Sequence, residues 1–294
     1  MSDKIVIKDL NVFYGNKQAL DNVNLEIVKG MFGLLGRNGA GKSTLMKSLV
    51  TLLPIKSGGI EICGVDIKEV KKIRKMIGYL PQDFNIYPNM NVMEALDYLA
   101  TLSNMIGENK KTAVRESLEI VNLWNDRNKK VKSLSGGMKR RLGIAQAIVH
   151  SPKVLIVDEP TAGLDPEERI RFRNLLANIA KERIVILSTH IVGDIESTCE
   201  KVAVLNNGKI IFNDTVGGLI NKANNCTYTA SIPRNKFHEY NEKYLITSHH
   251  DNGTEIIVKL ISSGKPESIF RLCEPGIEDG YLSLIYDMGG KGND

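Results

Sequence analysis

Apolar and polar residues alternate near the start of this chain, and the spacing changes from strand-like to helix-like further along. The runs at 5–7, 12–14 and 23–27 have a period of two and are separated by turns rich in Asn and Gly, which predicts strands. The continuous apolar run at 32–35 predicts a buried strand. Residues 44–50 carry apolar side chains at helical spacing, which predicts a helix directly after that strand.

The same succession of strand and helix returns later in the chain. Further strands are predicted at 58–64, 77–80, 154–157, 184–187, 202–205 and 210–212, the last two as a hairpin. Helices are predicted from Ser135 onward, at 167–181 and at 191–199. Between about 85 and 150 the pattern is mainly helical, which predicts a helical insert. Apolar runs that alternate with helices indicate a parallel sheet.

A polar stretch at 221–225 predicts a domain boundary, which divides the chain into 1–222 and 223–294. The second domain is predicted to be a small α+β appendage. Its predicted strands lie at 226–232, 243–248 and 254–262, and its predicted helices lie at 234–241 and 265–273.

The composition narrows the possible partners. The 294 residues are 42% hydrophobic, enough for a sizeable core, and the net charge is only +5. We find no basic tract with interleaved aromatic residues, so no nucleic-acid partner is expected. No apolar run reaches the roughly 18 residues of a membrane span, and the polar first residues do not resemble a signal peptide. The cysteines lack metal or redox spacing and are expected to be free thiols: Cys63, Cys199, Cys226 and Cys273.

One segment carries the strongest chemical signal. It fits the phosphate-binding pattern G-x-x-x-x-G-K-[ST] without a mismatch, between a predicted strand and a predicted helix, and reads Gly36-Arg37-Asn38-Gly39-Ala40-Gly41-Lys42-Ser43-Thr44. Glycines let backbone N–H groups turn toward phosphate oxygens, and the helix points its positive end at the same anion. Lys42 is placed to reach the β- and γ-phosphates and Ser43 to ligate Mg²⁺. The sequence therefore predicts a bound nucleoside triphosphate.

Weaker signals lie at the ends of other predicted strands. Asp158 and Glu159 end a buried strand, where the first could hold Mg²⁺ and the second could orient or deprotonate an attacking water. Gln82 follows another strand and could reach the metal or the water, and His190 could sense a γ-phosphate. Tyr14 could stack on a base. Taken alone, each of these residues also fits an ordinary turn or a solvated side chain.

A second candidate anion site opens the helix that starts after Ser135. Ser135 fits the N-cap position. Gly136 and Gly137 each weaken the first helical turn by about 1 kcal/mol, which makes sense if backbone amides must approach an anion closely. The alternative is a Ser-capped helix with flexible glycines.

Taken in order along the chain, these motifs resemble the ATP-binding cassette family, over roughly residues 4–220. The resemblance implies a P-loop NTPase core of the α/β class, with an antiparallel β subdomain and the helical insert. It implies that Tyr14 stacks on adenine, that Gly36 to Thr44 bind ATP, and that Gln82 joins metal sensing to the transport partner. It makes Ser135-Gly136-Gly137 the family's signature and Asp158 and Glu159 the metal-binding and catalytic carboxylates. Gly163-Leu164-Asp165 then crosses a dimer interface, and His190 is the switch histidine.

The resemblance narrows to bacterial exporters of drugs, peptides and lantibiotics. The segments that carry it are Tyr79–Asp83, Ile86–Val92 and Gly276–Leu282, together with Met138, where many family members have Gln. Met138 removes a polar side chain that could contact the ribose, so that contact is expected to be weaker.

The function implied is an ATPase that binds MgATP between two cassettes and drives a separate integral membrane permease from the cytoplasmic face. The second cassette is either another copy of this chain or a paralogue. The helical insert and the loop after Gln82, with Phe84, Ile86 and Tyr87, are expected to dock the permease. Two alternatives remain at this point, a soluble cassette ATPase of a non-transport complex and a nucleotide-binding regulatory module that does not hydrolyse.

Overall fold

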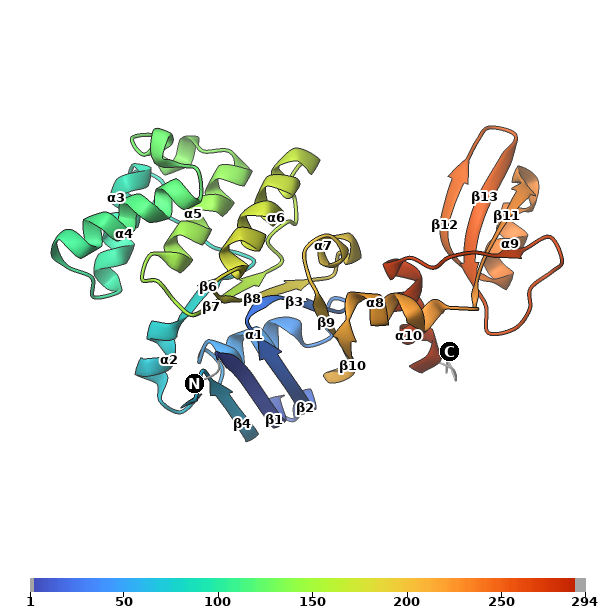
Figure 1. Ribbon diagram of the computed structural model, residues 1–294, viewed down its shortest axis with the longest axis horizontal. Helices are drawn as coiled ribbons and strands as arrows, with labels where there is room; N and C mark the ends of the chain where they lie inside the picture. The colour runs from blue at the N-terminus through green and yellow to red at the C-terminus, as the bar shows by residue number, and fades with distance from the viewer. Residues whose placement is uncertain (1–2, 289–294) are drawn as a thin grey trace. The chain divides into compact units, whose positions relative to one another are not determined.

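The computed structural model describes residues 3–288, and these fold as two compact units that divide after residue 213 (Figure 1). The sequence places the boundary after residue 222 instead. In the structure the first unit ends within β10 (Lys209–Thr215), and the polar stretch at 221–225 follows α8 (Val216–Ile220) inside the second unit. The polar composition of 221–225 reflects its exposure to solvent. The contacts of the chain pass from the first unit to the second earlier, after residue 213.

The first unit is built on a six-stranded sheet in the order β10-β9-β3-β8-β7-β6. Its other strands are β3 (Gly30–Leu35), β6 (Ile77–Leu80), β7 (Val154–Asp158), β8 (Ile184–Thr189) and β9 (Lys201–Asn206). The strands from β9 to β6 pair in parallel, and β7 and β8 are buried along their whole length. Strands covered on both faces need continuous apolar sequence, which explains why these runs do not alternate.

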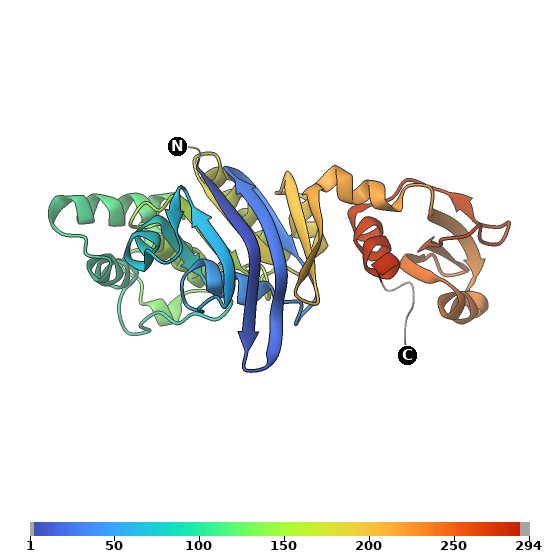
Figure 2. The same ribbon diagram turned by 90° about the horizontal axis from the view of Figure 1, so that it is seen from below.

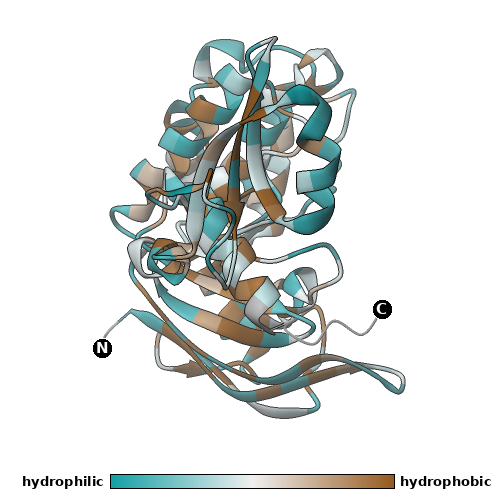
Figure 3. Ribbon diagram, turned by 90° about the vertical axis from the view of Figure 1, so that its right-hand side faces the viewer, coloured by the Kyte–Doolittle hydropathy of each residue, from teal (hydrophilic) through white to brown (hydrophobic). Residues whose placement is uncertain are grey.

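The second sheet of this unit is antiparallel, in the order β2-β1-β4-β5, and Figure 2 shows β1 and β2 side by side. Its strands are β1 (Lys4–Tyr14), β2 (Lys17–Val28), β4 (Ser57–Ile62) and β5 (Val65–Asp66). Buried and exposed residues alternate along much of β1 and β2, and Figure 3 shows hydrophobic (brown) and hydrophilic (teal) residues in bands along the strands. α1 (Lys42–Leu49) shares one hydrophobic core with both sheets through Leu45, Met46 and Leu49.

Three helices occupy the stretch predicted as a helical insert, and they lie together on one side of the parallel sheet (Figure 1). They are α3 (Val92–Leu102), α4 (Gly107–Ile120) and α5 (Gly136–Ile148). The remaining α-helices of the unit are α2 (Val70–Met76), α6 (Pro166–Ala180) and α7 (Val192–Glu196), and two short 3₁₀ helices lie at Trp124–Asp126 and Val131–Ser133. Asn91 and Glu94 form a reciprocal capping box that fixes the start of α3. Within residues 3–288, no helix has both the length and the apolar character of a membrane span.

The second unit contains an antiparallel sheet in the order β12-β13-β11-β14. Its strands are β11 (Thr227–Pro233), β12 (Leu245–Asp251), β13 (Glu255–Ile261) and β14 (Arg271–Leu272). Tyr240 of α9 (Phe237–Lys243) packs against the apolar face of this sheet in a small core of its own. α10 (Ile277–Met288) packs against α8 and is fastened to the sheet by an ion pair of 2.6 Å between Lys259 and Asp279.

The prediction of a helix at 265–273 is wrong, because this segment forms a loop and the short edge strand β14. Its apolar residues do not share one face. Phe270 is 7% exposed and packs on Tyr240, whereas Ile269 and Leu272 are 46% and 56% exposed. One buried side chain is enough to fix a loop, whereas a helix needs apolar residues along one face. The apolar pattern of this short segment does not distinguish a loop from a helix.

Candidate nucleotide site

A hollow of about 680 Å³ lies beside the loop between β3 and α1. It brings together most of the residues that the sequence predicts to hold a nucleotide. Those that line it are Tyr14, Asn38, Gly39, Gly41, Lys42, Ser43, Thr44, Gln82 and Glu159. They meet because β3, β6 and β7 end at the same edge of a parallel sheet, which is where such sheets bind ligands.

The phosphate-binding loop is held by close backbone contacts. Gly41 has φ of 111°, and a Cβ there would lie 2.9 Å from the carbonyl oxygen of Ala19. A Cβ on Gly36 would lie 2.4 Å from the carbonyl oxygen of Leu205. Both glycines are therefore required by the packing of the loop, in addition to any approach of a phosphate. Ala40, a residue of the same loop that is also predicted to bind ATP, is 4% exposed and does not line the hollow.

Lys42, Glu159 and His190 form a linked trio. Nζ of Lys42 lies 3.3 Å from Oε1 of Glu159, and Nδ1 of His190 lies 2.8 Å from Oε2 of the same carboxylate. Lys42 also donates to the carbonyl oxygen of Gly36 at 2.7 Å. Glu159 is 5% exposed, and its carboxylate has a hydrogen bond with His190 on Oε2 and the ion pair with Lys42, without a hydrogen bond, on Oε1. This geometry places a base beside the ammonium group expected to reach the phosphates.

Ser43 and Asp158, each next in sequence to a member of this trio, are in contact with one another. The Ser43 hydroxyl donates to Oδ2 of Asp158 at 3.0 Å, and Oδ1 of Asp158 is buried without a hydrogen bond. A hydroxyl and a carboxylate oxygen are ligands that suit Mg²⁺, so these two residues fit the metal predicted from the sequence. Burial and the nearby charge of Asp158 raise the pKa of Tyr79 to about 12.

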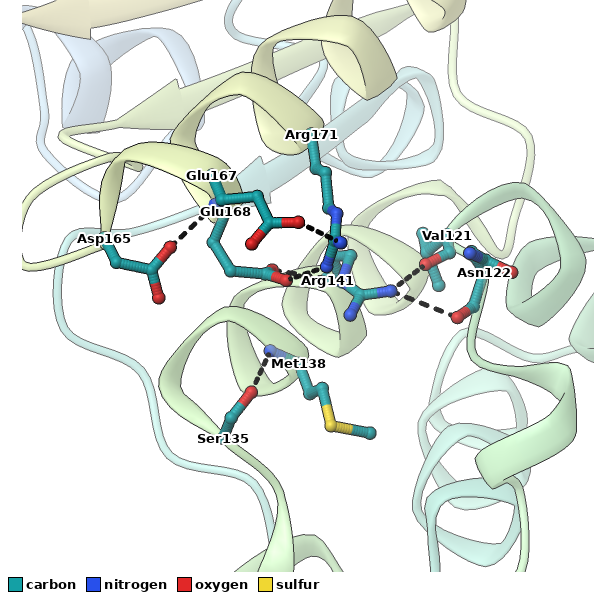
Figure 4. A network of polar contacts seen from close by, with 9 residues as sticks. All are labelled: Val121, Asn122, Ser135, Met138, Arg141, Asp165, Glu167, Glu168 and Arg171. Atoms are coloured by element: carbon teal, nitrogen blue, oxygen red, sulfur yellow. Dashed lines mark hydrogen bonds and ion pairs between the residues drawn. The ribbon is translucent and has the colours of Figure 1, made fainter.

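The signature residues lie elsewhere in the same chain. Ser135, Gly136 and Gly137 do not line the hollow that contains Lys42. Ser135 caps α5 by accepting a hydrogen bond of 3.2 Å from the backbone N–H of Met138 (Figure 4). Asp165 is also outside the hollow and caps α6 through the backbone N–H of Glu168 at 2.8 Å. Within one chain, therefore, only some of the residues that the resemblance assigns to nucleotide binding share one hollow.

The two signature glycines have different surroundings. A Cβ on Gly137 would lie 2.3 Å from Oε2 of Glu168, whereas a Cβ on Gly136 would meet nothing within 4 Å. The Glu168 carboxylate is itself held by Arg171 at 2.8 Å and lies 3.7 Å from Arg141 (Figure 4). Packing within the chain thus gives position 137 a second reason to be glycine besides the approach of an anion, and no such packing contact applies to Gly136.

Several residues in the hollow were not predicted from the sequence. They are Lys17, Gln18, Ala19, Asn207 and Gly208, whereas Arg37, which also lines the hollow, belongs to the predicted loop. Gly208 donates its N–H to the carbonyl oxygen of Ala40 at 2.9 Å, so the turn between β9 and β10 is fixed against the phosphate-binding loop. The Asn207-Gly208 turn is evident in the sequence, but its place in the site depends on the order of the strands in the sheet, which no local pattern reveals.

A second hollow, of about 730 Å³, lies between the segment after Gln82 and α5. Its lining includes Phe84, Ile86 and Arg140, and Gln82 lines both hollows. Arg140 donates to the carbonyl oxygens of Gln82 at 3.2 Å and of Ala162 at 3.3 Å. Burial lowers the pKa of Arg140, and the charges of Asp83 and Glu159 oppose this shift. One side chain therefore ties α5 to two segments of the nucleotide site.

Comparison with known proteins places this architecture in a family. A family profile described as "ABC transporter" matches residues 20–162. The bacitracin transport ATP-binding protein BcrA of Bacillus licheniformis is 40% identical over 215 residues, which cover 72% of this chain and 69% of that protein. The uncharacterized ABC transporter ATP-binding protein YxlF of Bacillus subtilis is 32% identical over 295 residues, which cover 95% and 99%.

Solved structures agree with the sequence relatives. The cbiO1 protein of Clostridium perfringens, part of an ABC transporter complex, superposes with a TM-score of 0.68 at 30% identity over 73% of this chain and 89% of that one. The dimeric cassette MJ0796 gives a TM-score of 0.64 at 27% identity over 72% and 98%. The fold, the site and these relatives together show that the chain belongs to the ABC transporter family and is an ATP-binding ATPase subunit.

Proposed function

We propose that this chain powers an exporter, as one of two cassettes that enclose ATP and drive a separate membrane permease. The observation that carries the proposal is the divided site. Lys42 and Glu159 share one hollow, and the Ser135 end of α5 lies outside it. In a head-to-tail pair, ATP would lie between the Lys42 loop of one cassette and Ser135-Gly136-Gly137 of the other. A cassette that binds ATP in this way favours the closed pair, and hydrolysis releases it.

Within each site we assign the chemistry to named side chains. Glu159 accepts a proton from water, the resulting hydroxide attacks the γ-phosphorus, and the bond between that phosphorus and the ADP oxygen breaks. Nδ1 of His190, 2.8 Å from Glu159, orients the carboxylate. Lys42 binds the β- and γ-phosphate oxygens, and Tyr14, 48% exposed at the end of β1, is available to stack on the base.

Mg²⁺ would be held by Ser43 and Asp158, with Gln82 close by on the wall of the hollow. The unpaired Oδ1 of Asp158 supports this assignment, since a buried oxygen without a hydrogen bond is costly unless a cation or water contacts it. When bound, the metal would neutralise negative charge on the phosphates.

The hollow between Gln82 and α5 is the proposed docking place for the permease. Phe84 and Ile86 give it apolar walls, and Tyr87, 51% exposed, stands near it in an edge-to-face contact with Tyr98. Because Gln82 lines both hollows, a permease segment seated here would lie next to the nucleotide. Docking at this site would place the chain on the cytoplasmic face of the membrane.

Export is supported by a relative named for it, the Nod factor export ATP-binding protein I of Burkholderia orbicola, which is 34% identical over 216 residues. BcrA is named for bacitracin transport, and the Bacillus subtilis protein LnrL, 37% identical over 202 residues, is named for linearmycin resistance. A methionine import protein, MetN of Carboxydothermus hydrogenoformans, is also 37% identical over 218 residues. The direction of transport is therefore a question for experiment.

Substitution of the catalytic carboxylate tests the mechanism. Glu159→Gln keeps the shape of the side chain but cannot accept the proton, so it should bind ATP, accumulate an ATP-bound dimer and lose turnover. Lys42→Ala is the comparison variant and should lose nucleotide affinity. Size-exclusion chromatography with ATP and phosphate release are the measurements. Turnover at the wild-type rate in Glu159→Gln would refute the assignment.

Transport is tested with the chain co-expressed with the membrane protein encoded beside it. The pair should fractionate with membranes, and inverted vesicles supplied with external ATP should accumulate bacitracin or linearmycin used as probes. Recovery of the chain in a complex that lacks a membrane protein would overturn the transport assignment, and ATP-driven movement in the opposite sense would overturn export.

A further inference from the structure

Thr161 and Asp194 form a buried hydrogen bond that the mechanism above does not use. The Thr161 hydroxyl donates to Oδ2 of Asp194, and each residue is only 1% exposed. Oδ1 of Asp194 is buried without a hydrogen bond and lies 3.8 Å from Nη1 of Arg173. A buried carboxylate with so few partners costs free energy, so this arrangement calls for a functional reason.

The bond connects the two segments that carry the catalytic pair. Thr161 is two residues after Glu159, and Asp194 is four residues after His190. β7 and β8 pair up to Asp158 and Ser188, and one further backbone bond of 2.9 Å joins the N–H of Glu159 to the carbonyl of Ser188. β7 ends at Asp158 and β8 ends at Thr189, and beyond these residues the two segments leave the sheet. They are then linked by side chains, through Glu159 with His190 and through Thr161 with Asp194.

Glu159 needs such a link because its backbone is strained. Its φ of 47° lies in the left-handed region, which residues with a side chain rarely adopt. Such a conformation persists only where the surrounding structure imposes it. On its N-terminal side Glu159 is fixed by the sheet. On its C-terminal side the nearest side-chain anchor is the bond from Thr161 to Asp194.

We propose that Thr161 and Asp194 are positioning residues that hold Glu159 in its left-handed conformation and so keep its carboxylate beside His190. The inference rests on the proposed role of Glu159. Without the hydroxyl of Thr161, Glu159 relaxes toward an ordinary backbone conformation and its carboxylate moves away from the attacking water. The Lys42 loop is attached to other strands and stays in place.

Other contacts keep the rest of the segment folded when this bond is removed. Arg140 donates to the carbonyl oxygen of Ala162 at 3.3 Å, and the N–H of Leu164 bonds to the carbonyl of Thr161 at 3.1 Å. Neither contact involves the Thr161 hydroxyl. Loss of the hydroxyl is therefore expected to affect the position of Glu159 more than the fold of the segment.

Two substitutions at Thr161 in the full-length chain separate the hydroxyl from the shape. Thr161→Val has the same shape without the hydroxyl, and Thr161→Ser keeps it. For Thr161→Val, kcat should fall at least about tenfold, because a misplacement of about 1 Å can cost 10²-fold. KM for ATP should stay within about twofold, since the phosphate-binding loop is unchanged. Thr161→Ser should retain kcat within about twofold, because its hydroxyl replaces the missing donor.

A double-mutant cycle with Asp194→Ala tests whether the two residues act together. If the bond is the functional unit, Thr161→Val and Asp194→Ala combined should be no slower than the slower single variant. Additive losses of kcat, or an equal loss in Thr161→Ser and Thr161→Val, would overturn the inference. A loss of ATP binding and of thermal stability in Thr161→Val would also overturn it, because that result indicates a general structural role.

The outcome separates this inference from the proposed function on which it rests. If Glu159→Gln abolishes turnover but Thr161→Val is as fast as the wild type, the positioning role fails and the catalytic assignment stands. If Glu159→Gln turns over normally, the catalytic assignment fails, and a slow Thr161→Val cannot rescue it.

Discussion

The contrast between Gly136 and Gly137 leads to a prediction about why a signature segment needs glycine. From the sequence, both glycines are explained by the approach of an anion. In the structure, the missing Cβ of Gly137 faces the Glu168 carboxylate of the same chain, and that of Gly136 faces open space. We predict that Gly137→Ala is harmful because it displaces Glu168, and that removing the Glu168 side chain restores the variant.

The distances around Gly137 set the expected change in the free energy of unfolding for Gly137→Ala. The 2.3 Å between the added Cβ and Oε2 must grow to at least 3.4 Å for ordinary contact, so Glu168 has to retreat by roughly 1 Å. Overpacking of this kind typically costs about 1–3 kcal/mol. Alanine in place of glycine stabilises a helix by about 1 kcal/mol, which offsets part of this cost. Gly137→Ala should therefore lose up to about 2 kcal/mol, and the same change in a Glu168→Ala background should gain about 1 kcal/mol.

Thermal unfolding and dimer formation measure the two consequences. In a unit of this size, 1 kcal/mol corresponds to about 2–4 °C in Tm. With Glu159→Gln present to block turnover, ATP should drive dimer formation in the Gly137→Ala/Glu168→Ala variant but much less in Gly137→Ala alone. Glu168→Ala is the matched control and should dimerise normally. If the double variant regains stability but not dimer formation, the reason for Gly137 is the nucleotide and the packing argument is refuted.

Two further predictions concern stability. Burial lowers the pKa of His150 from its usual 6.5, so below about pH 6.5 unfolding takes up a proton and stability should fall as the pH drops. His150→Gln should reduce that loss of Tm, and an unchanged slope would exclude His150 as its source. In the second unit, a Cβ on Gly280 would lie 2.1 Å from the carbonyl oxygen of Leu219. Gly280→Ala should cost about 1–3 kcal/mol in thermal unfolding, whereas Gly264→Ala, which meets nothing within 4 Å, should be neutral.

Much of the fold and site follows from local sequence because the signals are themselves local. The apolar runs that become β7 and β8 are continuous because both faces are covered. The carboxylates and amide placed after strands meet because parallel strands end at one edge. Asp158, Glu159 and Gln82 could thus be assigned to one region from the sequence alone.

Features that depend on packing between distant segments could not be predicted in this way. The place of Asn207 in the hollow requires knowing that β9 lies next to β3. The segment at 265–273 has enough apolar residues for a helix, but only Phe270 is buried. Gly137 shows the same limit at one residue, since a glycine in sequence does not reveal whether its missing Cβ would meet a ligand or a neighbouring side chain.

Arg140 connects segments that are far apart in the sequence: the start of α5, the segment at Gln82 and the segment at Ala162. Its guanidinium donates to Gln82 and to Ala162, so the helix that Ser135 opens is joined to both segments at the edge of the nucleotide hollow. Both acceptors are neutral carbonyl oxygens, and the planar fork of arginine reaches them at the same time. Lysine would keep the charge and could not reproduce this geometry. The connection between α5 and the nucleotide hollow therefore depends on the shape of this side chain more than on its charge.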